Sequence, residues 1–108
     1  MKLVIIESPL AGDYEANREY AKRCMLDSLS RGEAPLASHL LYAQPGILDD
    51  TIPHERECGI EAGLAWGAKA DLTAVYVDRG LSVGMRRGIR RAIAEGRMVE
   101  TRSLVVAL

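Results

Sequence analysis

The stretch "LVIIESPLAGDY", residues 3–14, decides the fold expected for this chain. Its apolar run, Leu3 to Ile6, is uninterrupted, which is typical of a strand covered on both faces. A turn rich in serine, proline and glycine follows, and Asp13 is a good N-cap for a helix over residues 14–30. Strand, loop and helix in this order predict the first half of a βαβ unit.

The rest of the chain repeats this alternation of strands and helices. We expect a short strand around 35–38, a polar loop over 39–52, a helix over about 54–68, a strand over 72–77, a helix from Ser82 to about Gly96, and one or two strands within 98–101 and 104–108. Such alternation predicts right-handed crossovers and a parallel sheet. The expected architecture is one α/β domain over 1–108, a small three-layer Rossmann-like (flavodoxin-like) fold with four or five mainly parallel strands. The runs 3–6 and 73–77 should both be central.

Composition and charge argue against several classes of protein, namely nucleic-acid-binding, membrane-spanning and secreted proteins. The chain has 108 residues, of which 48% are hydrophobic and 27% charged, and its net charge of −1 does not favour binding to a nucleic-acid polymer. No stretch reaches the roughly 20 apolar residues that span a membrane, and the N-terminal apolar run is too short for a signal peptide. We therefore expect a cytoplasmic protein without membrane contact. Cys24 and Cys58 are interpreted as small apolar core residues in a reducing compartment.

Three loops should meet at the carboxyl edge of the sheet, where ligands bind in such folds: residues 7–13, 39–51 and 78–82. The first loop offers backbone N–H groups to a phosphate but matches neither a P-loop nor GxGxxG, so a plain βα turn is an equal alternative. The second contains His39, and His54 follows it, near several carboxylates. Their spacing matches no standard metal site, so we expect no metal and an ordinary solvated acidic loop.

The helix after the third loop carries an unusual cluster of arginines. Ser82 can cap this helix, and Gly84 would let a ligand approach the backbone closely. Arg86 and Arg87 lie near its start, where the helix dipole is already positive. They also form like-charge pairs with Arg90 and Arg91 one turn later, and such pairs destabilise an isolated helix. An anion would relieve that repulsion, and so would an acidic patch on a second subunit. Residues 49–61 are rich in such acids.

The order of these motifs resembles the nucleoside 2-deoxyribosyltransferase-like superfamily, in particular its small and often phage-encoded branches. The matching features are Ser-Pro-x-x-Gly-Asp at 8–13, "APLASHLLYAQPGILDD" at 34–50, "ER" at 55–56, and Ser-x-Gly-Met at 82–85. The resemblance implies a Rossmann-like domain that binds a nucleoside or nucleotide and assembles as a homodimer or larger homo-oligomer. It implies no separate cofactor. Active members cleave the N-glycosidic bond with a glutamate on the helix after the Ser-x-Gly turn.

The chain departs from that pattern at the catalytic position, which is Gly88. Glycine cannot form a glycosyl-enzyme ester, so only Glu7 and Asp78 are left as candidate catalytic carboxylates. The resemblance implies that Ser8 and Gly12 line the pocket and that Asp78 meets sugar hydroxyls. Ser82, Gly84 and either Arg86 or Arg87 would hold a phosphate. We favour Arg86, with Arg87 in a salt bridge or a subunit contact.

Three functions follow from the sequence. The first is a nucleotide- or nucleoside-binding protein that lacks the standard glutamate-nucleophile transfer reaction. The second is an active N-glycosidase or deoxyribosyltransferase that uses another carboxylate. The third is a structural or interaction protein whose arginine helix docks on the acidic region of a second subunit.

Overall fold

The computed structural model describes residues 1–105 as an alternating series of strands and helices. The elements in chain order are β1 (Leu3–Glu7), α1 (Tyr14–Ser30), β2 (Ala34–Leu36), α2 (Ser38–Leu41), α3 (Pro53–Gly67), β3 (Leu72–Tyr76), α4 (Val83–Ala94) and β4 (Met98–Arg102). The side chain of Asp13 accepts from the backbone N–H of Ala16 at 3.1 Å, which fixes the start of α1 as predicted.

The four strands form one parallel sheet in the order β2-β1-β3-β4. Both apolar runs are central, as predicted, and every residue of β3 is buried. The chain leaves β1 toward β2 on one side and later returns to β3 on the other. This reversal makes the β1/β3 boundary the topological switch point of the sheet.

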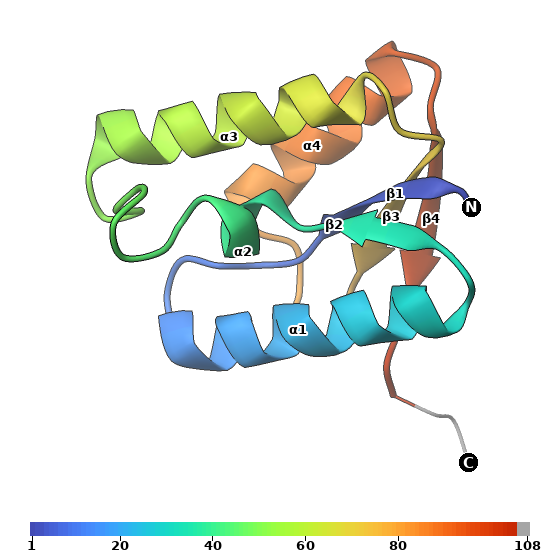
Figure 1. Ribbon diagram of the computed structural model, residues 1–108, viewed down its shortest axis with the longest axis horizontal. Coiled ribbons are helices and arrows are strands. Elements are labelled where there is room, and N and C mark those ends of the chain that lie inside the picture. Colours follow the sequence, from blue (N-terminus) through green and yellow to red (C-terminus); the bar gives the residue numbers. More distant parts are fainter. Residues whose placement is uncertain (106–108) are drawn as a thin grey trace.

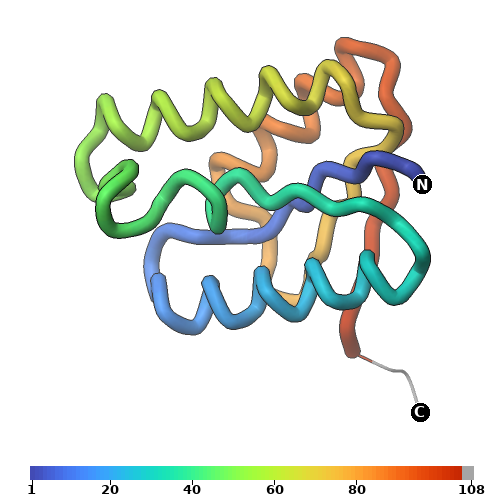
Figure 2. The backbone as a smooth tube through the Cα atoms, in the orientation of Figure 1, coloured from blue at the N-terminus to red at the C-terminus, as the bar shows by residue number. Residues whose placement is uncertain are grey.

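Helices cover both faces of the sheet, so the fold has the three layers expected. Figure 1 shows α1 on one face and α3 with α4 on the other, and Figure 2 shows the same arrangement as a backbone trace. Side chains alternate along β1: Val4 and Ile6 belong to the core cluster with Tyr20 and Cys24 of α1. Ile5 and Glu7 must then point to the opposite face, beneath α3 and α4.

Several details differ from the sequence expectations. The segment expected as a loop from residue 39 contains the short helix α2, because Leu40 packs against the core cluster. The strand expected over 35–38 is β2 and ends at Leu36, where α2 follows closely. Cys24 is buried, but Cys58 is exposed on α3 and is not a core residue. Residues 104–105 form no strand, and the remainder of that expected strand lies outside the described residues.

None of the helices within residues 1–105 is long and apolar enough to cross a membrane.

Candidate functional site

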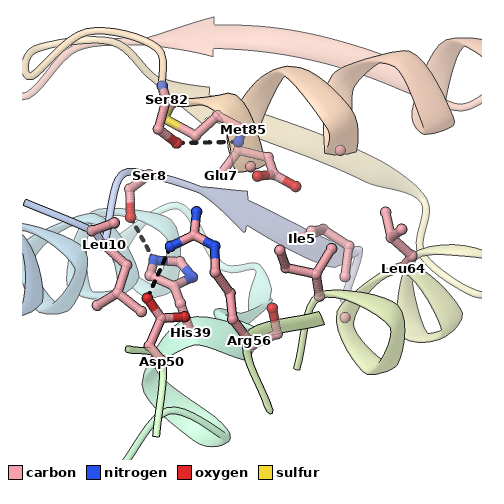
Figure 3. Close-up of a pocket in the computed structure, with 16 residues that line it drawn as sticks. Ile5, Glu7, Ser8, Leu10, His39, Asp50, Arg56, Leu64, Ser82 and Met85 are labelled. Carbon is pink, nitrogen blue, oxygen red and sulfur yellow. Dashed lines mark hydrogen bonds and ion pairs between the residues drawn. The ribbon is translucent and has the colours of Figure 1, made fainter. Parts of the chain in front are cut away.

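A cavity of about 90 Å³ lies at the carboxyl end of β1, on the face covered by α3 and α4. It occupies the switch point at which open α/β sheets bind ligands. Figure 3 shows its walls, which come from the loop after β1, from α2 and α3, and from the first turns of α4. The lining residues are Ile5, Glu7, Ser8, Leu10, Ala11, Ser38, His39, Asp50, Arg56, Ile60, Gly63, Leu64, Ser82, Gly84, Met85 and Gly88.

The start of α4 forms one wall and is fixed by its own cap. Ser82 is the N-cap, and its hydroxyl accepts from the backbone N–H of Met85 at 3.2 Å. The thioether of Met85 accepts in return from the N–H of Ser82 at 3.4 Å. Because Gly84 has no side chain, the cavity reaches the helix backbone at this turn. The predicted cap at Ser82 is confirmed, and the approach of a ligand at Gly84 remains a prediction.

Glu7 is the acidic residue that β1 delivers into the cavity. As the last residue of β1 it follows Ile5 on the same face, and it lies opposite Val75 of β3 in the register. Figure 3 shows its side chain beneath α4, close to Met85. The alternation of side chains along the strand therefore places this carboxyl beneath the helix.

Glycine at position 88 makes room for this carboxyl. A Cβ atom at Gly88 would lie 2.6 Å from Cδ of Glu7 and closer still to its Oε2, inside any normal contact distance. Glycine in a helix interior costs about 1 kcal/mol relative to alanine, so the position needs a compensating reason. The close approach of Glu7 to the backbone of α4 supplies it.

The environment of Glu7 favours its protonated form. Burial raises the pKa of Glu7 from 4.5 to about 8, although the positive charge of Arg97 acts in the opposite direction. Within residues 1–105 the Glu7 carboxyl has no hydrogen-bond partner that would stabilise its charge. A carboxyl of this kind is neutral at pH 7 and can donate a proton.

A hydrogen-bonded serine and histidine form the polar wall of the cavity. Ser8, buried in the loop after β1, and His39 of α2 approach to 2.7 Å between Oγ and Nε2. Burial lowers the pKa of His39 to about 4, and the charge of Asp50 offsets this only in part. The imidazole is therefore neutral at pH 7 and offers polar atoms rather than a positive charge.

An ion pair closes the cavity next to this histidine. Arg56 of α3 donates from Nη1 to Oδ2 of Asp50 at 3.0 Å, and the hydroxyl of Tyr14 donates to the same oxygen at 2.9 Å. Figure 3 shows the guanidinium of Arg56 directed into the cavity. Arg56 is thus an arginine in the site, from α3 and not from the arginine-rich helix.

The cavity brings together only some of the residues predicted for the site. Glu7, Ser8, Ser82 and Gly84 line it. The other four, Gly12, Asp78, Arg86 and Arg87, are absent from its lining.

Asp78 follows β3 but faces away from the cavity and binds other parts of the chain. Its carboxylate accepts from the Tyr20 hydroxyl at 2.5 Å, from the Ser103 hydroxyl, and from the backbone N–H groups of Leu104 and Val105. Burial acts to raise the pKa of Asp78, but these hydrogen bonds outweigh it and hold the pKa below its ordinary value. Asp78 thus ties the segment after β4 to α1.

The two leading arginines of α4 also lie outside the cavity. Arg87 donates to Glu57 of α3 at 2.6 and 2.8 Å and also pairs with Glu61. The salt-bridge role predicted for this residue is therefore filled within one chain. Arg86 is exposed, and within the described part of the chain no ion pair involves it.

A shallow groove of about 470 Å³ shares Ala11 and Ser82 with the cavity. Asp78 and Arg79 contribute to its lining. Arg79 is held in place, since its Nε donates to Oδ1 of the buried Asn17 at 2.8 Å. The cavity and the groove together follow the loops after β1 and β3.

Sequence reasoning missed three polar residues of the site: His39, Asp50 and Arg56. It treated the loop that holds His39 and Asp50 as solvated, although the rule of strand carboxyl ends had selected that loop. His39 directly follows the serine that begins α2, two residues beyond the end of β2, and that placement was the available signal. Among residues 1–105 no group of three or more histidine, cysteine or carboxylate side chains is arranged to hold a metal ion.

Solved structures of nucleoside-processing enzymes share this fold. A 2-deoxyribosyltransferase from Bacillus psychrosaccharolyticus matches with a TM-score of 0.66 and 15% identity, over 98% of this chain and 75% of that enzyme. A 2-deoxyribosyltransferase from Leishmania mexicana matches with a TM-score of 0.60 and 15% identity, over 97% and 66%. A CMP N-glycosidase from Clostridium botulinum matches with a TM-score of 0.53 and 15% identity, over 94% and 69%.

These matches confirm the deoxyribosyltransferase-like fold expected from the sequence. No curated protein sequence matches the chain significantly. The model of a family described as a domain of unknown function, DUF7768, matches residues 2–102. The chain therefore belongs to the DUF7768 family.

Proposed function

We propose that this chain binds a nucleoside or nucleotide at the carboxyl ends of β1 and β3. The observation that carries the proposal is the cavity at the switch point, where polar atoms of Glu7, Ser8, His39 and Arg56 lie beside apolar side chains of the wall. The proteins that share the fold are named for reactions of nucleosides and of CMP, which indicates the ligand class.

The size of the site indicates how the ligand would lie. Pockets that enclose a whole small molecule usually measure about 300–1,000 Å³. A cavity of about 90 Å³ accepts one ring of such a ligand, and we assign it to the sugar. The remainder would extend past Ser82 into the groove, where Arg79 and the N-terminus of α4 attract an anionic group and the carboxylate of Asp78 opposes it.

The competing interpretation as an interaction protein loses much of its basis. It depended on attraction between the arginine helix and the acids of residues 49–61 in another subunit. Arg87 already pairs with Glu57 and Glu61 of its own chain. Homodimerisation and a cytoplasmic location remain predictions. Light scattering at tens of micromolar tests the first, and a monomer would contradict it.

Calorimetry with ribonucleosides, deoxyribonucleosides and their 5′-monophosphates tests the proposed function. Ile60→Trp fills the cavity from α3, whereas Ile93→Trp places the same bulk on an exposed position of α4. We expect binding by the wild type and by Ile93→Trp, and at least tenfold weaker binding by a folded Ile60→Trp. Circular dichroism establishes that both variants fold. The absence of binding across the panel, or equal binding by both variants, contradicts the proposal.

A further inference from the structure

The close approach of Glu7 to Gly88 has a consequence for chemistry at this site. A side chain at position 88 would overlap the Glu7 carboxyl where it now lies, since even a Cβ there is 2.6 Å from Cδ, and the carboxyl would have to move. The two positions therefore share one volume beneath α4. A carboxyl can occupy that volume either from the end of β1 or from the helix, but not from both at once.

We propose that the Glu7 carboxyl is the proton-transferring catalytic group of an N-glycoside hydrolase at this site, in the volume that a side chain at position 88 would fill. The inference rests on the proposed function, because a nucleoside or nucleotide must place its glycosidic bond in the cavity. The catalytic inference goes beyond the proposed function, because binding alone needs no proton transfer.

The surroundings of Glu7 suit a proton donor. The carboxyl lines the cavity and, within residues 1–105, neither ion-pairs nor hydrogen-bonds to another side chain. Burial keeps its pKa near 8, so the acid form predominates at pH 7. The charges near it are Arg97, which is paired with Glu95, and Arg56, which is paired with Asp50.

The other candidate carboxylate is unsuited to this role. Asp78 lines the groove and not the cavity. Its oxygens accept from Tyr20, Ser103 and two backbone N–H groups, and its pKa lies below the ordinary value. It is therefore ionised at neutral pH and has no proton to donate.

The proposed reaction balances with water as the second reactant. The Glu7 carboxyl gives its proton to the base as the bond between the anomeric carbon and the base nitrogen breaks, and the electron pair of that bond stays on the nitrogen. Water then adds to the electron-deficient anomeric carbon, and the Glu7 carboxylate removes a proton from it. The products are the free base and the free sugar or sugar phosphate, and Glu7 is again protonated.

Two variants test the inference, with binding measured beside catalysis. Glu7→Gln keeps the shape and removes the proton transfer, so we expect release of free base to fall by about 100-fold or more. The double variant Glu7→Gly/Gly88→Glu returns a carboxyl to the shared volume from α4. We expect it to release base at least tenfold faster than Glu7→Gly alone. Glu19→Gln, an exposed carboxylate on α1, is the control and should behave as wild type.

The measurements are chromatographic detection of free base from the nucleoside and 5′-monophosphate panel, and calorimetric affinity for the same compounds. Binding without base release by the wild type overturns the catalytic inference and leaves the proposed function in place. Neither binding nor release overturns both. Release that survives Glu7→Gln, or a double variant no faster than Glu7→Gly, shows that the shared volume is not where the chemistry occurs.

Discussion

Glu7 and Asp78 are carboxylates at the ends of the two central strands, yet the fold treats them in opposite ways. Glu7 points beneath α4 into a cavity, has no hydrogen-bond partner within residues 1–105, and has its pKa raised to about 8 by burial. Asp78 accepts hydrogen bonds from α1 and from the segment after β4, and these hold its pKa low. The difference shows that position at a strand end does not decide the protonation state of a carboxyl group, because burial and hydrogen-bond partners do. A carboxylate with every lone pair used stabilises the fold, and one without partners is available for a ligand.

Removing Asp78 should have the largest effect on stability. Asp78→Ala leaves the buried hydroxyl of Tyr20 without its acceptor and releases Ser103 and the N–H groups of Leu104 and Val105. Hydrogen bonds to a charged group contribute about 1.5–3 kcal/mol each, so we expect a loss of about 3 kcal/mol in the free energy of unfolding. Urea denaturation at pH 7 measures it.

A control for this variant is Asp49→Ala, since within residues 1–105 the carboxylate of Asp49 accepts only from Thr51 in its own exposed loop. We expect it to leave the free energy of unfolding nearly unchanged, because solvent replaces these hydrogen bonds. Equal losses for the two variants would show that Asp78 does not tie the C-terminal segment to α1.

Titration of Glu7 should have the next largest effect on stability. Replacing Glu7 should stabilise the protein at higher pH, whereas replacing Asp78 destabilises it. Because the folded pKa of about 8 exceeds the ordinary 4.5, the folded state binds more protons than the unfolded chain between these values. The contribution of the Glu7 carboxyl to the free energy of unfolding is fully present below pH 4.5 and declines as pH rises to 8. Glu7→Gln removes the decline, so its stability relative to wild type should increase by about 2 kcal/mol between pH 5 and pH 6.5. Thermal denaturation across this range measures the difference, and parallel curves for the two proteins would contradict it.

The fold could be read from the sequence because its signals are local. The apolar runs of β1 and β3, Asp13 before α1 and Ser82 before α4 each specify their own element. Predicting the site would have required the distances between elements, which the sequence does not contain. The sequence singled out Glu7 as a candidate carboxylate and Gly88 as the position of the missing glutamate. That the two positions share one volume depends on the register of β1 against β3 and on the packing of α4 over both strands.

Asp78 illustrates the remaining limit of sequence reasoning. Its place after β3 is the same as that of Glu7 after β1, so a rule about strand ends selects both. Glu7 is the last residue of its strand and keeps the direction of the pleat, whereas Asp78 is two residues beyond Tyr76. Which way it turns depends on Tyr20 and Ser103, which lie 58 and 25 residues away along the chain.

A double-mutant cycle between positions 7 and 88 should show a coupling of about 1 kcal/mol. Gly88→Ala gains helix propensity of about 1 kcal/mol, but in the wild type its Cβ must displace the Glu7 carboxyl. In a Glu7→Ala background the gain should appear in full, and in the wild type it should be cancelled. Gly84→Ala is the matched control on the same helix, because a Cβ there meets only Ser82 Oγ at 4.0 Å. Its effect should be the same in both backgrounds, and an absence of coupling for Gly88 would contradict the shared volume.

The smallest effects should come from the arginines at the start of α4, and they differ in sign. Arg87→Ala removes partly exposed pairs with Glu57 and Glu61, so it should cost about 0.5–1 kcal/mol, and the loss should shrink in high salt. Arg86 is exposed near the positive end of the helix dipole and one turn before Arg90, so Arg86→Ala should raise stability by a few tenths of a kcal/mol. Urea denaturation at low and high salt separates the two variants. A loss of stability for Arg86→Ala as large as that for Arg87→Ala would mean that Arg86 has an anionic partner. If that loss occurs only when nucleotide is present, the partner is the phosphate of the nucleotide.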